Sequence, residues 1–323
     1  MCDPNTALET INSTAKSTTV LGKLVGKFFG PSWEKKQADA VDYTAKVILK
    51  LIRDNPDMDI IYDNGELSIK RHDAIALASR ADEREAIESV RQQHNLESVI
   101  GVAETTLGDK VCVNNESVDE DFITRLFNIA KDANKREMQF IWGKILDHEV
   151  VEPGSFSLRT LEVVRNLNKL EEEVFHKVAA VTLKSGKQYF LPANLDLTAK
   201  YGVDFASLLM LQECGLLQSF EALPLNVSLG REGIVGLENN GNIIVIKRNG
   251  SSKSLFSFNA YKFTKAGQEL LRVLTPNSEK RYAFEYGKFL QINNLDLNVN
   301  AYEVISKKDN GEIIFSDKPI NFD

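Results

Sequence analysis

Cysteine, histidine and proline are scarce in this chain of 323 residues, which contains 3, 4 and 8 of them. The three cysteines lie far apart, which excludes a disulfide framework and indicates a reducing compartment. Eight prolines and 19 glycines are too few for a low-complexity chain. No histidines or cysteines have the spacing of a metal-binding pair, so we expect no metal site.

A surplus of positive charge is missing as well. The 39 Lys and Arg residues stand against 46 Asp and Glu residues, a net charge of −7. This excludes a chain that nucleic acid holds by overall charge, but it is compatible with a local basic patch. No apolar run reaches the roughly 18 residues of a membrane-spanning helix, and the first residues lack the features of a secretory signal. We therefore expect a soluble, cytoplasmic protein of more than one domain.

Sequence signatures of catalysis are absent too. The chain has no phosphate-binding loop, no nucleophile elbow and no dinucleotide-binding fingerprint. We name no catalytic residue and expect no cofactor. The sequence favours a protein that is not an enzyme, without deciding the question.

Residues 20–29 (VLGKLVGKFF) are typical of a short amphipathic helix that ends at Gly30-Pro31. Glycine recurs at every fourth position, and each interior glycine costs about 1 kcal/mol relative to alanine. One interpretation is a helix packed tightly against its own domain, or a poorly ordered tail. The other is self-association or contact with an anionic membrane surface, which would place the protein peripherally at the inner membrane. The candidate surface comprises Gly22, Gly26, Gly30, Leu24, Phe28, Phe29, Lys23 and Lys27.

The next hundred residues predict helices with one ambiguous turn. Asp63-Asn64-Gly65 favours either a small hairpin or a loop between helix ends. Residues 69–99 predict a long, charged helix with a thin apolar stripe, either solvated or used in assembly. From residue 118 the pattern predicts a packed helical bundle, with Ser117 as the first N-cap and a break at residues 132–134.

The run from Trp142 to residue 167, WGKILDHEVVEPGSFSLRTLEVVRNL, resembles the central block of the bacterial family named domain of unknown function 2806. Members carry a Trp-Ala-(Lys)-Ile-Leu-Ala-Gly-Glu phrase followed by Pro-Gly-Ser-(Phe/Tyr)-Ser-Leu-Arg-Thr-Leu. This chain departs from that phrase at Gly143, Asp147 and His148. The resemblance implies a bacterial origin and a helical middle followed by a mixed tail, and it implies no reaction. The N-terminal segment is also similar to those of some abortive-infection proteins.

Within this block we expect a structural lock. Pro153-Gly154 predicts a tight turn, and Ser155 and Ser157 can bind amides at the start of the next helix. Arg159 lies in the first turn of that helix, where the helix dipole disfavours a cation, so we expect a carboxylate partner such as Glu149, Glu152 or Glu162. The alternative is an anion site in which Arg159 and the amides near Ser155 bind a phosphate.

The C-terminal part changes to strands and hairpins. Asn239-Asn240-Gly241 predicts a hairpin turn, and a helix, a β-hairpin and a second helix at residues 264–274 follow the order of a winged-helix-like module. A local basic cluster accompanies it and is either a nucleic-acid contact or an ordinary solvated hairpin. Its members are Lys247, Arg248, Lys253, Lys262 and Lys265.

These observations predict an α+β protein, helical in its N-terminal and central regions and winged-helix-like with β-hairpins at its C-terminus. We divide it into residues 1–56, 57–117, 118–184 and 185–323. The function we favour is a non-enzymatic bacterial interaction or effector protein, related to stress or phage defence. It would form a homo-oligomer and contact a membrane, a partner protein or a phage component through its N-terminal helix. The alternative is a nucleic-acid-binding regulator that uses the C-terminal module.

Overall fold

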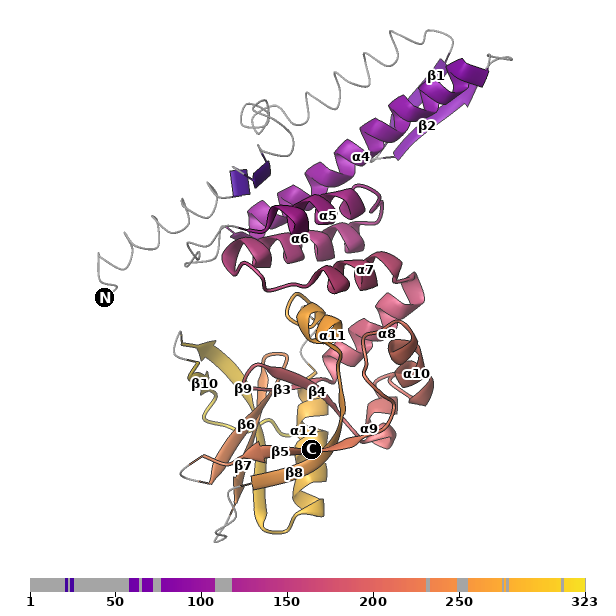
Figure 1. The fold of residues 1–323 in the computed structure, drawn as a ribbon. Coiled ribbons are helices and arrows are strands. Elements are labelled where there is room, and N and C mark those ends of the chain that lie inside the picture. Colours follow the sequence, from indigo (N-terminus) through magenta and orange to yellow (C-terminus); the bar gives the residue numbers. More distant parts are fainter. Residues whose placement is uncertain are drawn as a thin grey trace, which may run out of the picture. The chain divides into compact units, whose positions relative to one another are not determined.

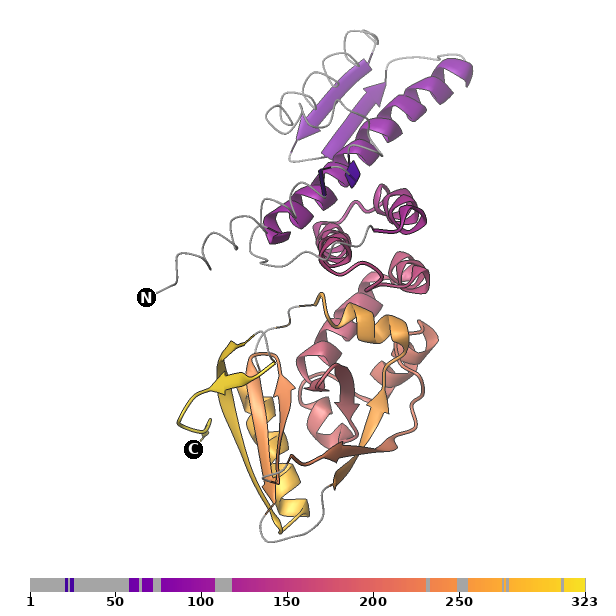
Figure 2. The same ribbon diagram turned by 60° about the vertical axis from the view of Figure 1, so that its left-hand side comes forward.

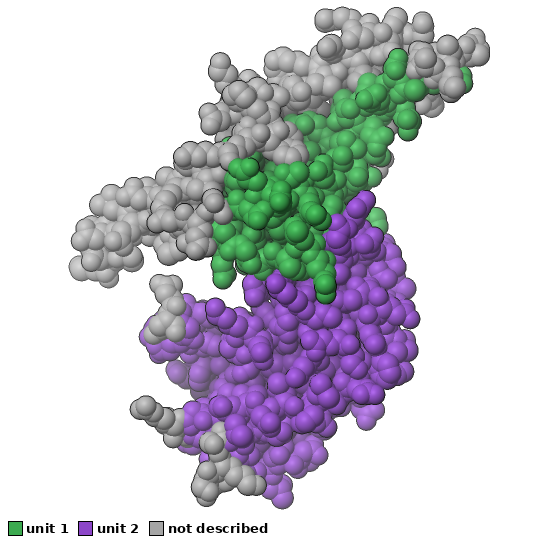
Figure 3. Space-filling model, viewed as in Figure 1, with its two compact units in different colours: residues 1–161 green, residues 162–323 purple. Residues whose placement is uncertain are grey.

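The structure is a computed structural model that describes residues 21, 22, 24, 25, 58–63, 66–71, 77–107, 118–230, 233–248, 255–274, 276, 279–308 and 311–322. The chain forms two compact units, residues 1–161 and 162–323, which Figure 3 shows in different colours. The first half of the described chain is mainly helical and an antiparallel sheet of eight strands follows (Figure 1), which confirms the predicted α+β class. The four-part division of the chain stays a prediction.

The first unit begins, among the described elements, with an antiparallel hairpin in which Met58 pairs with Arg71. Asp63 and Glu66, which flank Asn64-Gly65, belong to paired strands and not to helix ends, as in the hairpin alternative. Helices follow it, and the last of them continues into the second unit. The elements are β1 (Met58–Asp63), β2 (Glu66–Arg71), α4 (Leu77–Leu107), α5 (Glu120–Ala130), α6 (Arg136–Val151) and α7 (Leu158–Asn166).

The start of α5 differs from the prediction by two residues. Asp119 is the N-cap, and its carboxylate accepts hydrogen bonds from the amides of Asp121 and Phe122. Ser117 lies outside the described residues. Asp119 is the stronger cap because its negative charge also lies at the positive end of the helix dipole. The predicted break between the two helices is confirmed, since α5 ends at Ala130 and α6 begins at Arg136.

Helix α4 packs against α6 along its C-terminal half. Its buried face there consists of Leu96, Val99, Ile100, Ala103 and Leu107. The two helices approach so closely at Gly143 that an added Cβ would lie 2.5 Å from Cβ of Val102 and 2.8 Å from the Val99 carbonyl oxygen. The N-terminal half of α4, which is rich in charged residues, is more exposed than the C-terminal half, whose apolar face belongs to the core.

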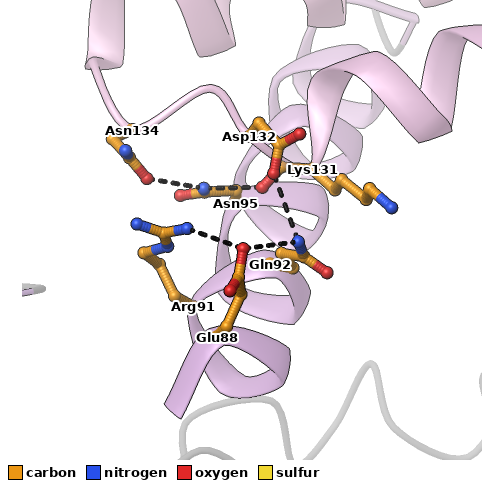
Figure 4. Close-up of polar contacts among 7 residues, drawn as sticks. All are labelled: Glu88, Arg91, Gln92, Asn95, Lys131, Asp132 and Asn134. Carbon is orange, nitrogen blue, oxygen red and sulfur yellow. Dashed lines mark hydrogen bonds and ion pairs between the residues drawn. The ribbon is translucent and has the colours of Figure 1, made fainter. Parts of the chain in front are cut away.

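A polar network ties α4 to the turn between α5 and α6 (Figure 4). The carboxamide of Asn95, which is buried, donates to the Lys131 carbonyl at 2.8 Å and to the Asn134 side chain at 2.9 Å. Gln139 donates to Asn95 Oδ1 at 3.1 Å. The last carbonyls of a helix lack partners within the helix, so Asn95 satisfies a backbone acceptor just beyond the end of α5.

The second unit is built on the eight-stranded sheet, with strand order β10-β9-β7-β6-β3-β4-β8-β5. Every pairing in it is antiparallel. The strands are β3 (Leu183–Ser185), β4 (Gln188–Pro192), β5 (Leu223–Ser228), β6 (Ile234–Asn239), β7 (Asn242–Arg248), β8 (Leu255–Lys262), β9 (Leu297–Lys307) and β10 (Ile313–Phe315). The helices are α8 (Lys169–Ala180), α9 (Leu195–Ala199), α10 (Phe205–Glu213), α11 (Lys265–Leu270) and α12 (Lys280–Asn293).

Helix α12, for which the sequence analysis made no prediction, packs along β7 and β9 (Figure 2). It buries Tyr282, Tyr286 and Leu290, spaced four residues apart as on one face of a helix. The predicted turn between β6 and β7 is confirmed by positive φ angles at Asn240 (41°) and Gly241 (87°), which a two-residue hairpin turn of this kind requires.

Two short sequence motifs meet at the start of α11. The Thr264 hydroxyl donates to the Gly215 carbonyl at 2.6 Å and accepts from the Gly267 amide, so it joins the end of α10 to the new helix. Gly267 lies so close to this turn that an added Cβ would be 2.2 Å from the Leu216 carbonyl oxygen. Only glycine permits this approach.

We expect Gly143→Ala to destabilise the protein by about 1–3 kcal/mol, because overpacking of a core has costs of this size. Gly101→Ala in α4 is the matched control, since an added Cβ there meets nothing within 4 Å. The control should be neutral or stabilised by up to about 1 kcal/mol through its helix propensity. Urea unfolding followed by circular dichroism measures both, and equal effects would contradict the close helix contact.

Candidate anion-binding site

A pocket of about 490 Å³ lies in the second unit, where β8 ends and α11 begins. Four cationic side chains line it, and no Asp or Glu stands among the described lining residues. The cations are Lys187, Lys262, Lys265 and Arg272. We refer to this feature as the basic pocket.

Chain segments far apart in sequence bring these cations together. Lys187 lies in the turn between β3 and β4, after Gly186, whose φ of +59° suits a tight turn. Lys262 is the last residue of β8, and Lys265 is the first of α11. Because β4 pairs with β8, with Phe190 opposite Lys262, the turn carrying Lys187 lies next to the end of β8.

Gln268 fastens the β3–β4 hairpin to α11 inside the pocket. Its carboxamide accepts from the Tyr189 amide at 2.8 Å and donates to the Tyr189 carbonyl at 2.5 Å. The strand pairing between β4 and β8 ends at Phe190 and Lys262, so β8 supplies no partner for the backbone of Tyr189. The Gln268 carboxamide binds the Tyr189 amide and carbonyl in its place. The pocket wall thus consists of satisfied backbone groups on a fixed scaffold.

The pocket combines positive charge with an apolar lining. The rings of Phe190 and Phe263 contribute to it, and both residues are almost fully buried. Lys265 lies 3.6 Å from the buried carboxylate of Glu269, whereas Lys187 and Lys262 are exposed and form no ion pair within the described residues. Such a concave site concentrates the field of its cations and attracts anions with an organic part.

The structure divides the basic cluster that the sequence predicted. Lys262 and Lys265 share the basic pocket, whereas Lys247 and Arg248 lie on β7, four strands away in the sheet. Neighbouring strands lie about 4.8 Å apart, so four such spacings separate β7 from β8 by about 19 Å. Arg248 forms a 2.8 Å ion pair with Asp296, and Lys253 lies outside the described residues.

Lys187 and Arg272 were not among the candidate residues that the sequence indicated. Neither lies in the charged hairpin region that drew attention in the sequence. Lys187 follows a turn glycine between two strands, which is a local signal, but its place beside Lys262 depends on the strand order. A search by sequence distance could not have joined Lys187 to Lys262, whereas Arg272 follows Lys265 by only seven residues and could have been found in this way.

The glycine-striped N-terminal surface is only partly described. Leu21 and Val25 are buried, Leu24 is half-buried, and an added Cβ at Gly22 would meet nothing within 4 Å. Among the described residues, therefore, no close helix contact requires a glycine at position 22. The other predicted members, Lys23, Gly26, Lys27, Phe28, Phe29 and Gly30, lie outside the described residues. No helix in the described part of the chain is both long and apolar enough to cross a membrane.

Among the partners expected for Arg159, Glu149 is excluded, because its carboxylate binds the turn after α6 instead. Glu149, which is 1% exposed, accepts hydrogen bonds from the Gly154 amide (2.6 Å), the Phe156 amide (3.1 Å) and the Ser155 hydroxyl (3.1 Å). Arg159 is exposed and forms no ion pair with Glu149. The carboxylate satisfies the amides of the turn itself, so these amides are not open to a phosphate.

Neighbouring groups act on Glu149 in opposite directions. Burial raises the pKa of this carboxyl and is the largest cause, while the hydrogen bonds from Gly154, Phe156 and Ser155 lower the pKa. Ser157, also expected in the lock, instead shares a hydrogen bond of 3.0 Å with the Thr160 hydroxyl. The lock is therefore a carboxylate enclosed by one loop.

We expect Glu149→Gln to destabilise the protein by about 1–3 kcal/mol, since a buried donor would lose its acceptor and meet an NH₂ group instead. Glu152→Gln is the control, because Glu152 is exposed three residues away. Fluorescence of the buried Trp142 during urea unfolding gives the measurement. A loss of similar size in both variants would argue against the enclosed carboxylate.

Gln268→Ala should leave the Tyr189 amide and carbonyl without their partner and loosen the β3–β4 hairpin. Hydrogen exchange at the Tyr189 amide is expected to accelerate by about fivefold or more, because such a hydrogen bond has a net value of about 1 kcal/mol. Gln218→Ala, also in the pocket lining, is the control. Unchanged protection of Tyr189 would refute the role of the Gln268 carboxamide.

A comparison of the chain with models of protein families gives a match. The model of a family described as protein of unknown function (DUF2806) matches residues 79–286, which include the four cations of the basic pocket. Neither the curated proteins nor the solved structures contain a match to the chain.

Proposed function

The chain belongs to the DUF2806 family of unknown function, and we propose that it is a non-enzymatic binding protein whose second unit binds a small phosphate-bearing molecule. The observation that carries the proposal is the basic pocket, with four cations, no carboxylate among its described lining residues and aromatic residues in its wall. Lysine and arginine bind phosphate through charge-assisted hydrogen bonds, and the volume suits a small organic ligand.

We further propose that this unit is winged-helix-like. From α8 to β8 its elements run α8, β3, β4, α9, α10, β5, β6, β7 and β8, and three of these strands are neighbours in the order β4-β8-β5. A winged helix likewise places two short helices of a helix-turn-helix before a two-stranded wing. In this interpretation β5 and β8 form the wing, and the β6–β7 hairpin is an insertion within it.

The chemistry of α10 favours a small ligand over nucleic acid. This helix would occupy the place of the recognition helix, yet its sequence FASLLMLQE contains no Lys or Arg. Phe205 and Leu209 are exposed on it by 49% and 38%. Nucleic acid binding depends on cations that contact phosphates and base edges, so α10 lacks what such a role requires. The predicted assembly, membrane contact and defence role stay predictions.

Isothermal titration with adenosine 5′-monophosphate tests the proposal. We expect binding that weakens with added salt, because exposed charges are screened. Lys262→Glu should weaken it by at least about tenfold, the effect of losing a charge-assisted bond of about 1.5–3 kcal/mol. Lys318→Glu is the control with the same change of charge, on an exposed residue outside the pocket.

Two results would count against the proposal. Absence of binding by the wild-type chain would overturn it, and equal losses in the two variants would show that only net charge matters. Titration with a DNA duplex belongs in the same experiment. Tight duplex binding that Lys262→Glu abolishes would favour the nucleic-acid regulator instead.

A further inference from the structure

A second pocket of about 150 Å³ shares two lining residues, Tyr189 and Arg272, with the basic pocket. It also contains Lys184 and Lys307, together with one carboxylate, Glu238. Its volume is below the roughly 300–1,000 Å³ of sites that enclose a small organic molecule, whereas the basic pocket falls within that range. The second pocket has room for a compact group such as phosphate.

The strand register places these side chains in one row. Lys184 of β3 pairs with Tyr189 of β4 on one side and with Glu238 of β6 on the other. Directly paired residues in a sheet point to the same face. The Lys184 ammonium lies 5.4 Å from the centroid of the Tyr189 ring, and Lys307 of β9 forms an ion pair with Glu238. The row ends at Tyr189, on the wall of the basic pocket.

The second pocket is positive despite its carboxylate. Three cations, Lys184, Arg272 and Lys307, stand against Glu238 alone among its described lining residues. Arg272 belongs to both pockets, and a guanidinium can bind two neighbouring phosphate oxygens at once because its donors form a planar fork.

Tyr189 can act as a donor at this shared wall. Burial raises the pKa of its hydroxyl, the charge of Glu238 raises it further, and Arg272 lowers it. The hydroxyl therefore stays protonated at neutral pH, and an anion in either pocket would not meet a phenolate.

We propose that the ligand is a nucleoside polyphosphate, whose nucleoside and first phosphate occupy the basic pocket while its terminal phosphate enters the second pocket past Tyr189 and Arg272. This rests on the proposed function, since it assumes that the basic pocket binds a phosphate ester. The larger pocket has the volume and the aromatic lining for the organic part, and the smaller one has mainly charged and polar groups. Both pockets should then bind the same molecule. Once the nucleoside and first phosphate are bound, the terminal phosphate is held close to the second pocket, and this raises the affinity for the whole ligand.

Titration with adenosine mono-, di- and triphosphate tests this inference on the full chain. We expect the triphosphate to bind at least about tenfold more tightly than the monophosphate. Lys184→Gln should remove most of this difference and leave monophosphate binding within about twofold. Glu238→Gln should act in the opposite direction and strengthen triphosphate binding, because it removes the one repulsive charge.

Monophosphate affinity is the internal control for folding of each variant, and Lys318→Gln is the control for an exposed lysine elsewhere. Equal binding of all three nucleotides, with Lys184→Gln without effect, would overturn the inference and leave the proposed function standing. Failure of every nucleotide to bind would instead overturn the proposed function, and the inference with it. A Lys184→Gln variant that loses monophosphate and triphosphate binding equally would also count against the second pocket.

Discussion

The approach of Gly267 to the Leu216 carbonyl is the constraint on which the second unit depends. An ordinary side chain at this position would place its Cβ 2.2 Å from a backbone oxygen, so α11 could not begin there. Because α11 begins there, Gln268 binds the backbone of Tyr189 on β4, and Lys265 lines the same pocket as Lys187. One backbone contact thus positions the residues on both sides of the basic pocket.

In both units, side chains form hydrogen bonds with backbone groups that have no partner in a helix or sheet. Buried backbone groups need partners, and side-chain amides and carboxylates supply them where the regular ladders stop. Asn95 binds the Lys131 carbonyl beyond α5, Glu149 binds the amides of the turn after α6, and Gln268 continues the pairing of β4. At the end of α8, the carboxamides of Asn239 and Asn240 bind the Ala180 carbonyl. These polar residues fix turns and hairpins more than they mark reactive sites.

Average charge is a poor guide to this protein. The chain carries a net charge of −7, yet its basic pocket has no carboxylate among its described lining residues. Several lysines and arginines elsewhere are neutralised, as Arg248 is by Asp296 and Lys280 is by Glu303. What decides attraction of an anion is the arrangement of charges around a concave surface, which the composition does not contain.

The sequence by itself determined the local features. It specified the break between α5 and α6, the turn at Asn240-Gly241 and the α+β class, because short-range backbone preferences govern each of them. It also contained the four-residue spacing of Tyr282, Tyr286 and Leu290 that defines α12, a signal that the sequence analysis overlooked. Only the tertiary structure decided which lysines share a site. Lys247 and Lys262 are close in sequence but four strands apart, while Lys187 and Lys262 are distant in sequence and share a pocket, since the order of strands in a sheet depends on contacts between distant segments.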